Sequence, residues 1–264
     1  MRKTMPIASM KKWTSTLIIG AEWDNARLRE AFTTCGFSEV TLVEDPATFA
    51  IRGDVVDVFS PAHENPVRIE RWGDDIAEMR AFDAKTQRTL ASVESCDIFP
   101  ARTEVLNTET IRLARARIRA LGSSLHVPSK TMSAVISDLD AGLHFVGIDS
   151  MLPAFYDGLD DIFDYLPKDF LLAVDEPDRV VTQAIELEEK RRGEHAQTIE
   201  DQELALAYED HYKNADATLQ FLRDATRVEF RRVAIETADS QLPLAPDERS
   251  FAFTARPNSD IVQL

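Results

Sequence analysis

The sequence predicts an α+β module, an antiparallel sheet with a helix, followed by a partial α/β domain that is rich in helix. Short apolar and β-branched runs alternate with turn residues between about positions 40 and 99. After Pro100 the apolar residues recur at helical spacing, and one later apolar run ends in two acids. We therefore expect domains at residues 14–98 and 99–240, with a linker or tail at 241–264.

The composition is that of a globular protein with room for one or two domains. The chain has 264 residues, of which 44% are hydrophobic and 29% charged. No apolar run reaches the ~18 residues of a membrane span, and LIIGA is shorter than the apolar core of a signal peptide. Two cysteines, Cys35 and Cys96, suit a reducing compartment, so we expect a cytoplasmic protein with no membrane partner. A net charge of −16 disfavours direct binding to nucleic acid.

The first predicted helix covers residues 24–35. Asp24 or Asn25 can cap its start, and Gly36 is a plausible stop after its end. Leu28 and Phe32 lie one turn apart and predict an apolar face.

A meander of strands is expected next, up to about Phe99. Turn residues in SPAHENP, GDD and DAKTQR separate the runs. The RGD tripeptide at Arg52 lies inside a run with strand character rather than at a loop tip, which disfavours a role in cell adhesion. The predicted strands are VTLVED, FAIRGDVVDVFS, PVRIERW, IAEMRAFD and SVESCDIF.

Helices dominate the second predicted domain. Residues 108–121 place Ile111, Ala114, Ile118 and Leu121 on one face, with Thr108 as N-cap and Gly122 as the stop. A stripe of arginines on another face of this helix is better explained as solvated than as a phosphate site. The remaining predicted elements are a helix at 130–141, a strand at 170–174, charged helix over 178–225 and a strand at 227–237.

Catalytic and cofactor motifs are missing from the sequence. It contains no G-x-x-x-x-G-K-[ST], no G-x-G-x-x-G and no cysteine pair at metal-ligand spacing. His195 and His211 are too far apart to form a ligand pair on adjacent turns. LLAVDEP, ending at Asp175 and Glu176, is similar to the magnesium-holding strand of P-loop ATPases, but without the P-loop lysine it indicates a degenerate copy. We therefore expect no catalytic residue, no metal and no cofactor.

The strand from Pro66 to Trp72 carries the candidate binding residues. Alternation places Val67 and Ile69 on one face, and Arg68 and Trp72 on the other. An exposed tryptophan beside an arginine is typical of protein interfaces. The alternative is that Trp72 covers a small core edge while Arg68 pairs with Glu70 or Asp74.

The same residues carry a family resemblance. The run IRGDVVDVFSPAHENPVRIERWGDDIAEMRAFDAKTQRTL, followed by DIFPAR, resembles the domain shared by the bacterial transcription-repair coupling factor and UvrB. The likeness continues through GIDSMLPAFYDGLDDIFDYLPKDFLLAVDEP and covers about residues 16–240. The turn DAKTQRTL, the ending DEP and the missing P-loop favour the coupling factor over UvrB.

The resemblance implies a docking module for UvrA. By position the docking residues are Arg52, Arg68 and Trp72, although many relatives have phenylalanine at the last position. The chain then resembles a fragment of a coupling factor, in which a non-catalytic adaptor recruits excision repair and another region, absent here, is an ATP-dependent motor that uses magnesium. Other domains of the full-length protein are further implied partners. Two alternatives remain: a fragment of a UvrB-like ATPase, and an autoinhibitory module that binds within its own protein.

Overall fold

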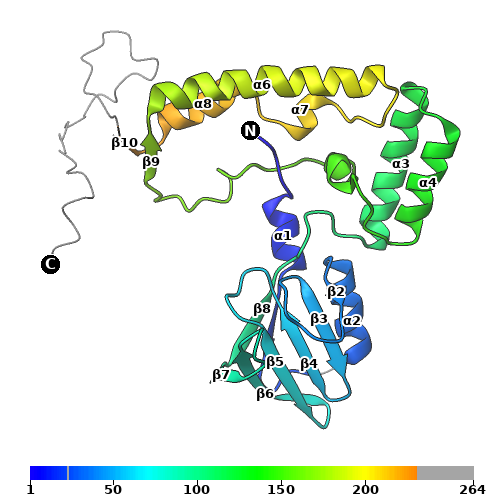
Figure 1. Cartoon of the computed structure of the whole chain (residues 1–264), viewed down its shortest axis with the longest axis vertical. Coiled ribbons are helices and arrows are strands. Elements are labelled where there is room, and N and C mark those ends of the chain that lie inside the picture. The colour runs from blue at the N-terminus through cyan, green and yellow to red at the C-terminus, as the bar shows by residue number, and fades with distance from the viewer. Residues whose placement is uncertain (23, 231–264) are drawn as a thin grey trace. The chain divides into compact units, whose positions relative to one another are not determined.

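The computed structural model describes residues 1–22 and 24–230, and its backbone divides into two compact units. The first unit comprises Met1–Lys168 with Glu188–Asn214, and the second begins with Asp169–Leu187 and resumes at Ala215. The first unit holds a six-stranded sheet and several helices, whereas the second is built around a parallel strand pair (Figure 1). The expected boundary at 98/99 falls inside the first unit, so the predicted division of the chain stays a prediction.

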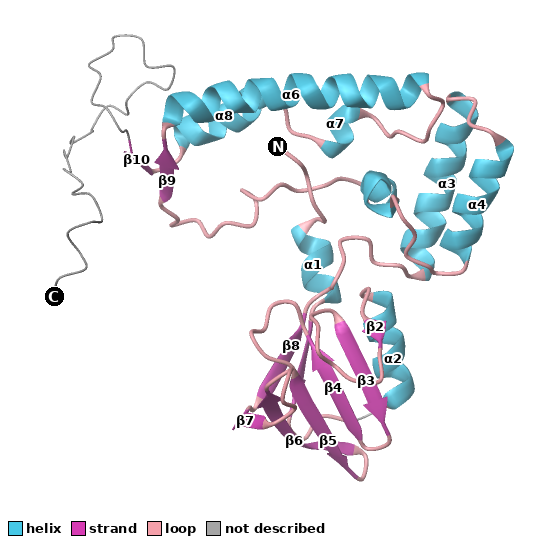
Figure 2. Ribbon diagram, viewed as in Figure 1, coloured by secondary structure: helices cyan, strands magenta, loops and turns pink. Residues whose placement is uncertain are grey.

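The sheet is largely the antiparallel meander that the sequence predicts. Its strand order is β2-β3-β4-β5-β6-β7, with β2 parallel to β3 and every later neighbour antiparallel. Figure 2 shows α2, Asn25–Thr34, beside these strands. The strands are β2 Ser38–Glu39, β3 Thr48–Arg52, β4 Val55–Phe59, β5 Val67–Trp72, β6 Asp75–Phe82 and β7 Thr89–Ser92.

Three strand predictions need correction. VTLVED is not a strand, because the carbonyls of Thr41 and Val43 bond to side chains from neighbouring segments instead of to a ladder. FAIRGDVVDVFS is two strands, β3 and β4, joined by a tight turn. SVESCDIF does not extend the sheet: β8, Ser95–Ile98, leaves it and pairs with β1, Ser15–Ile18.

The expectation that the RGD tripeptide lies within a strand is also wrong. Gly53 and Asp54 form the exposed turn between β3 and β4, and Gly53 has a φ of +61°. Glycine adopts this left-handed conformation without steric cost, which explains why the apolar run folds back here.

Helix α2 begins and ends where the sequence predicts. The Asp24 carboxylate accepts from the backbone amides of Ala26 and Arg27. Gly36 follows the helix with a φ of +86°, and the next amide, of Phe37, donates to the Phe32 carbonyl at 2.9 Å. These are the bonds of a Schellman motif, which satisfies carbonyls at the end of a helix.

One face of the sheet packs against α2. Phe32 of α2 lies within 5.0 Å of Phe49 of β3, measured between ring centroids, and both are buried. Val56, Ile69 and Met79 complete this apolar layer from the next three strands. The opposite face of β3–β6 carries a small buried cluster, Ala50, Phe59 and Phe82 with Val43, and beside it polar side chains.

The helices after the sheet begin at other residues than predicted. Asn107, not Thr108, caps α3: its side chain accepts from the amides of Glu109 and Thr110, because Thr108 already has helical geometry. Gly122 does not end α3 but is buried within its last turn, where a Cβ would lie 2.3 Å from the Met132 sulfur. The helices after the sheet are α3 Thr108–Ser124, α4 Ser129–Asp140, the 3-10 turn η1 Ile148–Met151, and α5 Leu152–Phe155, whereas α1, Ile7–Trp13, precedes it.

Buried residues of α3 confirm the predicted apolar face. Ala114 and Ile118 are almost completely buried, and they pack in one cluster with Leu139 of α4 and Phe155 of α5. The pKa of the Tyr156 hydroxyl in the same cluster is raised because burial disfavours its charged form.

The second unit contains a short parallel pair. β9, Leu172–Asp175, pairs with β10, Arg227–Phe230; it begins two residues later and ends one residue later than the predicted strand at 170–174. The region 178–225, predicted to be mostly helical, contains α6 Pro177–Glu200, α7 Tyr208–His211 and α8 Ala215–Asp224. Residues 231–237 of the predicted last strand and the predicted tail at 241–264 lie outside the described residues. None of the described helices combines the length and the apolarity needed to cross a membrane.

Candidate protein-docking surface

The polar face of the sheet is formed by side chains of β3, β4, β5 and β6. We use the name polar face for Arg52, Asp57, Arg68, Glu70, Glu78 and Arg80. Cross-strand pairing places Asp57 opposite Arg68, and Arg68 opposite Arg80. Glu70 lies opposite Glu78 on the same two strands. The register therefore gathers residues that lie far apart in the sequence.

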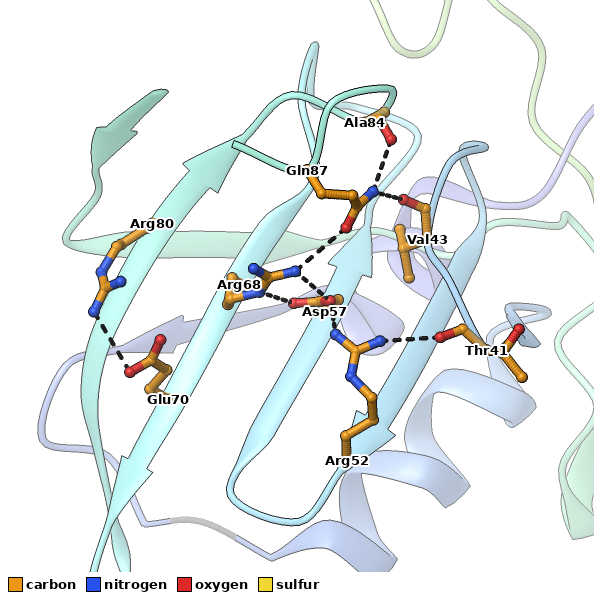
Figure 3. A network of polar contacts seen from close by, with 9 residues as sticks. All are labelled: Thr41, Val43, Arg52, Asp57, Arg68, Glu70, Arg80, Ala84 and Gln87. Atoms are coloured by element: carbon orange, nitrogen blue, oxygen red, sulfur yellow. Dashed lines mark hydrogen bonds and ion pairs between the residues drawn. The ribbon is translucent and has the colours of Figure 1, made fainter. Parts of the chain in front are cut away.

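A buried carboxylate holds two of the predicted site residues together. Asp57 is 0% exposed and accepts from Arg68 through both oxygens, at 2.7 Å from Nε and 2.9 Å from Nη2. Nη2 of Arg52 donates to the same carboxylate, while its Nη1 donates to the Thr41 carbonyl at 3.0 Å (Figure 3). A buried charge is stable only when it is paired and hydrogen-bonded, and the two guanidinium groups meet both conditions.

Arg68 is held more tightly than the sequence suggested. Its guanidinium carbon lies 4.7 Å from the centre of the Phe82 ring, and its Nη2 also donates to Gln87 at 3.3 Å. The hydrogen bonds to Asp57 raise the pKa of this guanidinium. The alternative pairing of Arg68 with Glu70 or Asp74 is wrong, because its ion-pair partner is Asp57.

Gln87 belongs to this network and was not identified from the sequence. It lies in the turn between β6 and β7 with a φ of +59°, and its Nε2 donates to the carbonyls of Val43 and Ala84 (Figure 3). Its side chain therefore ties the turn to the loop before β3 and leaves its oxygen for Arg68. A single glutamine in a polar turn carries no pattern that would reveal this role.

Near β6, the polar face has more carboxylates than arginines. Arg80 lies between two carboxylates: its Nε donates to Glu78 at 2.6 Å, and its Nη2 is 3.4 Å from Glu70. The bonds between Arg80 and Glu78 raise the pKa of the guanidinium and lower that of the carboxyl. Two arginines thus share one carboxylate near β4, and two carboxylates share one arginine near β6.

Trp72 is 85% exposed at the end of β5. It is paired with Asp75, and the register between β5 and β6 shifts between Glu70 and Arg71, just before it. The alternative that it covers a core edge is wrong. Beside it, Arg71 donates from Nε to Asp54 at 2.9 Å, which ties the β3–β4 turn to the end of β5.

The structure brings together Arg52 and Arg68 directly, and Trp72 follows Arg68 on the same strand. Asp57 was not identified from the sequence, although the sequence carries a signal for it: it is the one acid in the apolar run VVDVF of β4. A lone carboxylate among buried aliphatic residues requires a cationic partner.

Other candidate sites have structural explanations within the described chain. Arg115, from the predicted arginine stripe, is paired with Asp140. The His195 ring hydrogen-bonds to the Leu206 carbonyl at 2.7 Å. Among the residues that the structure describes, no group of three or more histidine, cysteine or acidic side chains could hold a metal ion. Both cysteines are buried and free, and burial raises the pKa of Cys35 to about 11.

Comparison with known proteins places this surface in a family. Residues 16–103 match the family described as the UvrB interaction domain. The chain is 35% identical over 181 residues to the transcription-repair-coupling factor of Myxococcus xanthus, an alignment that covers 67% of this chain. The resemblance to the transcription-repair coupling factors is confirmed.

Two further coupling factors show the same relationship. The protein from Mycobacterium tuberculosis is 30% identical over 176 residues, or 65% of this chain, and that from Haemophilus influenzae is 24% identical over 221 residues, or 83%. The chain spans 15% of the length of the Myxococcus protein, 14% of the Mycobacterium protein and 19% of the Haemophilus protein. The polar face and Trp72 all lie within the matched domain.

Proposed function

We propose that this chain is a non-catalytic adaptor region that docks onto UvrA through the polar face and Trp72. In a complete coupling factor, this adaptor would recruit nucleotide excision repair to a stalled RNA polymerase in the cytoplasm. The match of residues 16–103 to an interaction domain supports the proposal. ATP and magnesium would act elsewhere in such a protein, whose other domains are further partners, and this chain would need no cofactor.

Trp72 is the observation that carries the proposal. It lies on β5, the strand that also carries Arg68, and hydrogen bonds to Asp57 already set the positions of Arg68 and Arg52. Tryptophan and arginine are the residues most enriched among interface hot spots. Because the free chain leaves the indole 85% exposed, most of its apolar area remains to be buried by a partner.

The second unit fits a structural remnant better than a catalytic one. The parallel register of β9 and β10, with Asp175 at the end of β9, supports the proposed P-loop-like origin. The sequence has no P-loop lysine and hydroxyl to hold phosphates. We therefore propose that this part lacks a nucleotide site and has no enzymatic role.

Calorimetric titration of the chain with UvrA from the same organism tests the docking proposal. Trp72→Ala and Arg52→Ala are the informative variants. The indole of Trp72 is 85% exposed, and after loss of Arg52 the buried Asp57 carboxylate keeps both hydrogen bonds from Arg68; circular dichroism of each variant checks that it is folded. We expect each to weaken binding by about 2 kcal/mol or more, on the order of thirtyfold in affinity.

Matched controls come from outside the matched domain. Arg112→Ala removes an exposed arginine of α3, and Leu171→Ala removes a leucine that is 64% exposed before β9. Neither should change the affinity by more than about twofold. Equal binding by the parent and both site variants would place the interface elsewhere, and no binding by a folded parent would refute the proposed function.

A further inference from the structure

Asp57 is buried, and the guanidinium groups of Arg52 and Arg68 hydrogen-bond to its carboxylate. It has no exposed surface, lies in the middle of β4 between Val56 and Val58, and accepts hydrogen bonds from two different strands. Removing one partner of a buried ion pair costs much more than the pair contributes. The carboxylate therefore restrains both guanidinium groups, and each arginine is restrained with respect to the other.

The restrained pair keeps unused donors and an unbalanced charge. A guanidinium has five N–H donors. Across the part of the chain that the structure describes, neither Nε of Arg52 nor Nη1 of Arg68 has a hydrogen-bond partner. The side chain of Arg52 is 43% exposed and that of Arg68 is 25% exposed. Two arginines against one carboxylate leave one positive charge near β4, whereas Arg80 with Glu70 and Glu78 leaves one negative charge near β6.

We propose that Asp57 is a positioning residue that joins Arg52 and Arg68 into one preformed site for a single carboxylate of the partner protein. The inference rests on the proposed function, in which this face docks a protein. One incoming carboxylate balances the pair of arginines, and a planar fork that is already oriented loses little rotamer freedom on binding it. The net negative charge of Glu70, Glu78 and Arg80 near β6 repels a second acidic side chain of the partner. This repulsion favours one orientation of the partner on the face.

Asp57→Asn separates positioning from simple charge, because the two explanations predict opposite signs. The substitution keeps the shape of the side chain and makes the face more positive by one charge. If the face attracted an acidic partner only by its charge, binding would become tighter and association faster. If Asp57 positions the arginines, binding becomes weaker through faster dissociation, even though association is not slowed.

The experiment is biosensor kinetics of the full chain with UvrA for the parent and for Asp57→Asn. We expect at least a tenfold faster dissociation with an association rate equal to or above that of the parent. In an Arg52→Ala background, where Arg68 still pairs with Asp57, the same substitution should change the affinity less than in the parent, because one of the two arginines to be positioned is gone. Unchanged or tighter binding by Asp57→Asn in the parent background would overturn the proposal.

A measurement on the free chain keeps this inference separate from the identity of the partner. In the parent, the Arg68 Nε–H is bonded to Asp57 at 2.7 Å and should exchange slowly with water in NMR spectra, unlike that of Arg112, which is exposed. Asp57→Asn should speed the Arg68 exchange at least tenfold, and Asp57→Ala more so. If the parent does not bind UvrA, the proposed function fails and this exchange decides the positioning role. Slow exchange that persists in both variants refutes it.

Discussion

Gly36→Ala tests how the chain turns after α2. Gly36 has a φ of +86°, and a residue with a side chain in the left-handed region costs about 1–2 kcal/mol. An added Cβ would also lie 2.8 Å from Cγ of Arg102 and 3.0 Å from its Cβ and Cδ. Cγ and Cδ of the exposed Arg102 side chain can rotate away, but its Cβ moves only with the backbone, and overpacking of this kind costs about 1–3 kcal/mol. We expect a total loss of about 2–5 kcal/mol in the free energy of unfolding.

The control is Gly20→Ala, because Gly20 has a nearly identical φ of +82° and no atom within 4 Å of the position of an added Cβ. Urea unfolding followed by far-UV circular dichroism should show a loss of about 1 kcal/mol for this variant. The excess loss at Gly36 measures the crowding by Arg102, and it should shrink in an Arg102→Ala background. Equal losses at the two glycines would refute the crowding argument, and no loss at either would refute the argument from left-handed geometry.

Two further outcomes are expected. Asn107→Ala should destabilise the chain by about 1 kcal/mol through loss of the α3 cap, while Thr108→Ala should be nearly neutral. Thermal unfolding of both variants measures these losses. A larger loss for Thr108→Ala than for Asn107→Ala would show that Thr108 is the cap. Burial lowers the pKa of His211 to about 4, from an ordinary value of 6.5, so the unfolded state binds more protons between these values. Stability is then full above about pH 6.5 and falls as the pH drops toward 4, by about 1–2 kcal/mol between pH 7 and 5 after allowance for partial exposure. Urea unfolding at both pH values should show this loss in the parent and a smaller one in His211→Gln; identical losses would exclude His211 as the cause.

Local patterns determined much of the first domain. The cap at Asp24, the stop at Gly36 and the strands around Ile69 and Met79 follow from short-range chemistry, and the structure has them as predicted. Alternation alone also placed Arg68 on the face opposite Val67 and Ile69, because successive side chains of a strand point to opposite sides. Predictions failed where a segment lacked a strand partner, as in VTLVED, or where a turn interrupted an apolar run, as at Gly53.

Only the tertiary structure decided how the site residues are held. The sequence by itself placed Arg52, Arg68 and Trp72 in strand segments, and the structure has them in β3 and β5. It did not show that Asp57 joins the two arginines, because cross-strand register sets which residues face each other. Nor did it show that Gln87 accepts a hydrogen bond from Arg68 out of the turn between β6 and β7. The reason is physical: a hydrogen bond depends on distances of about 3 Å between atoms, and these distances exist only after the sheet has formed.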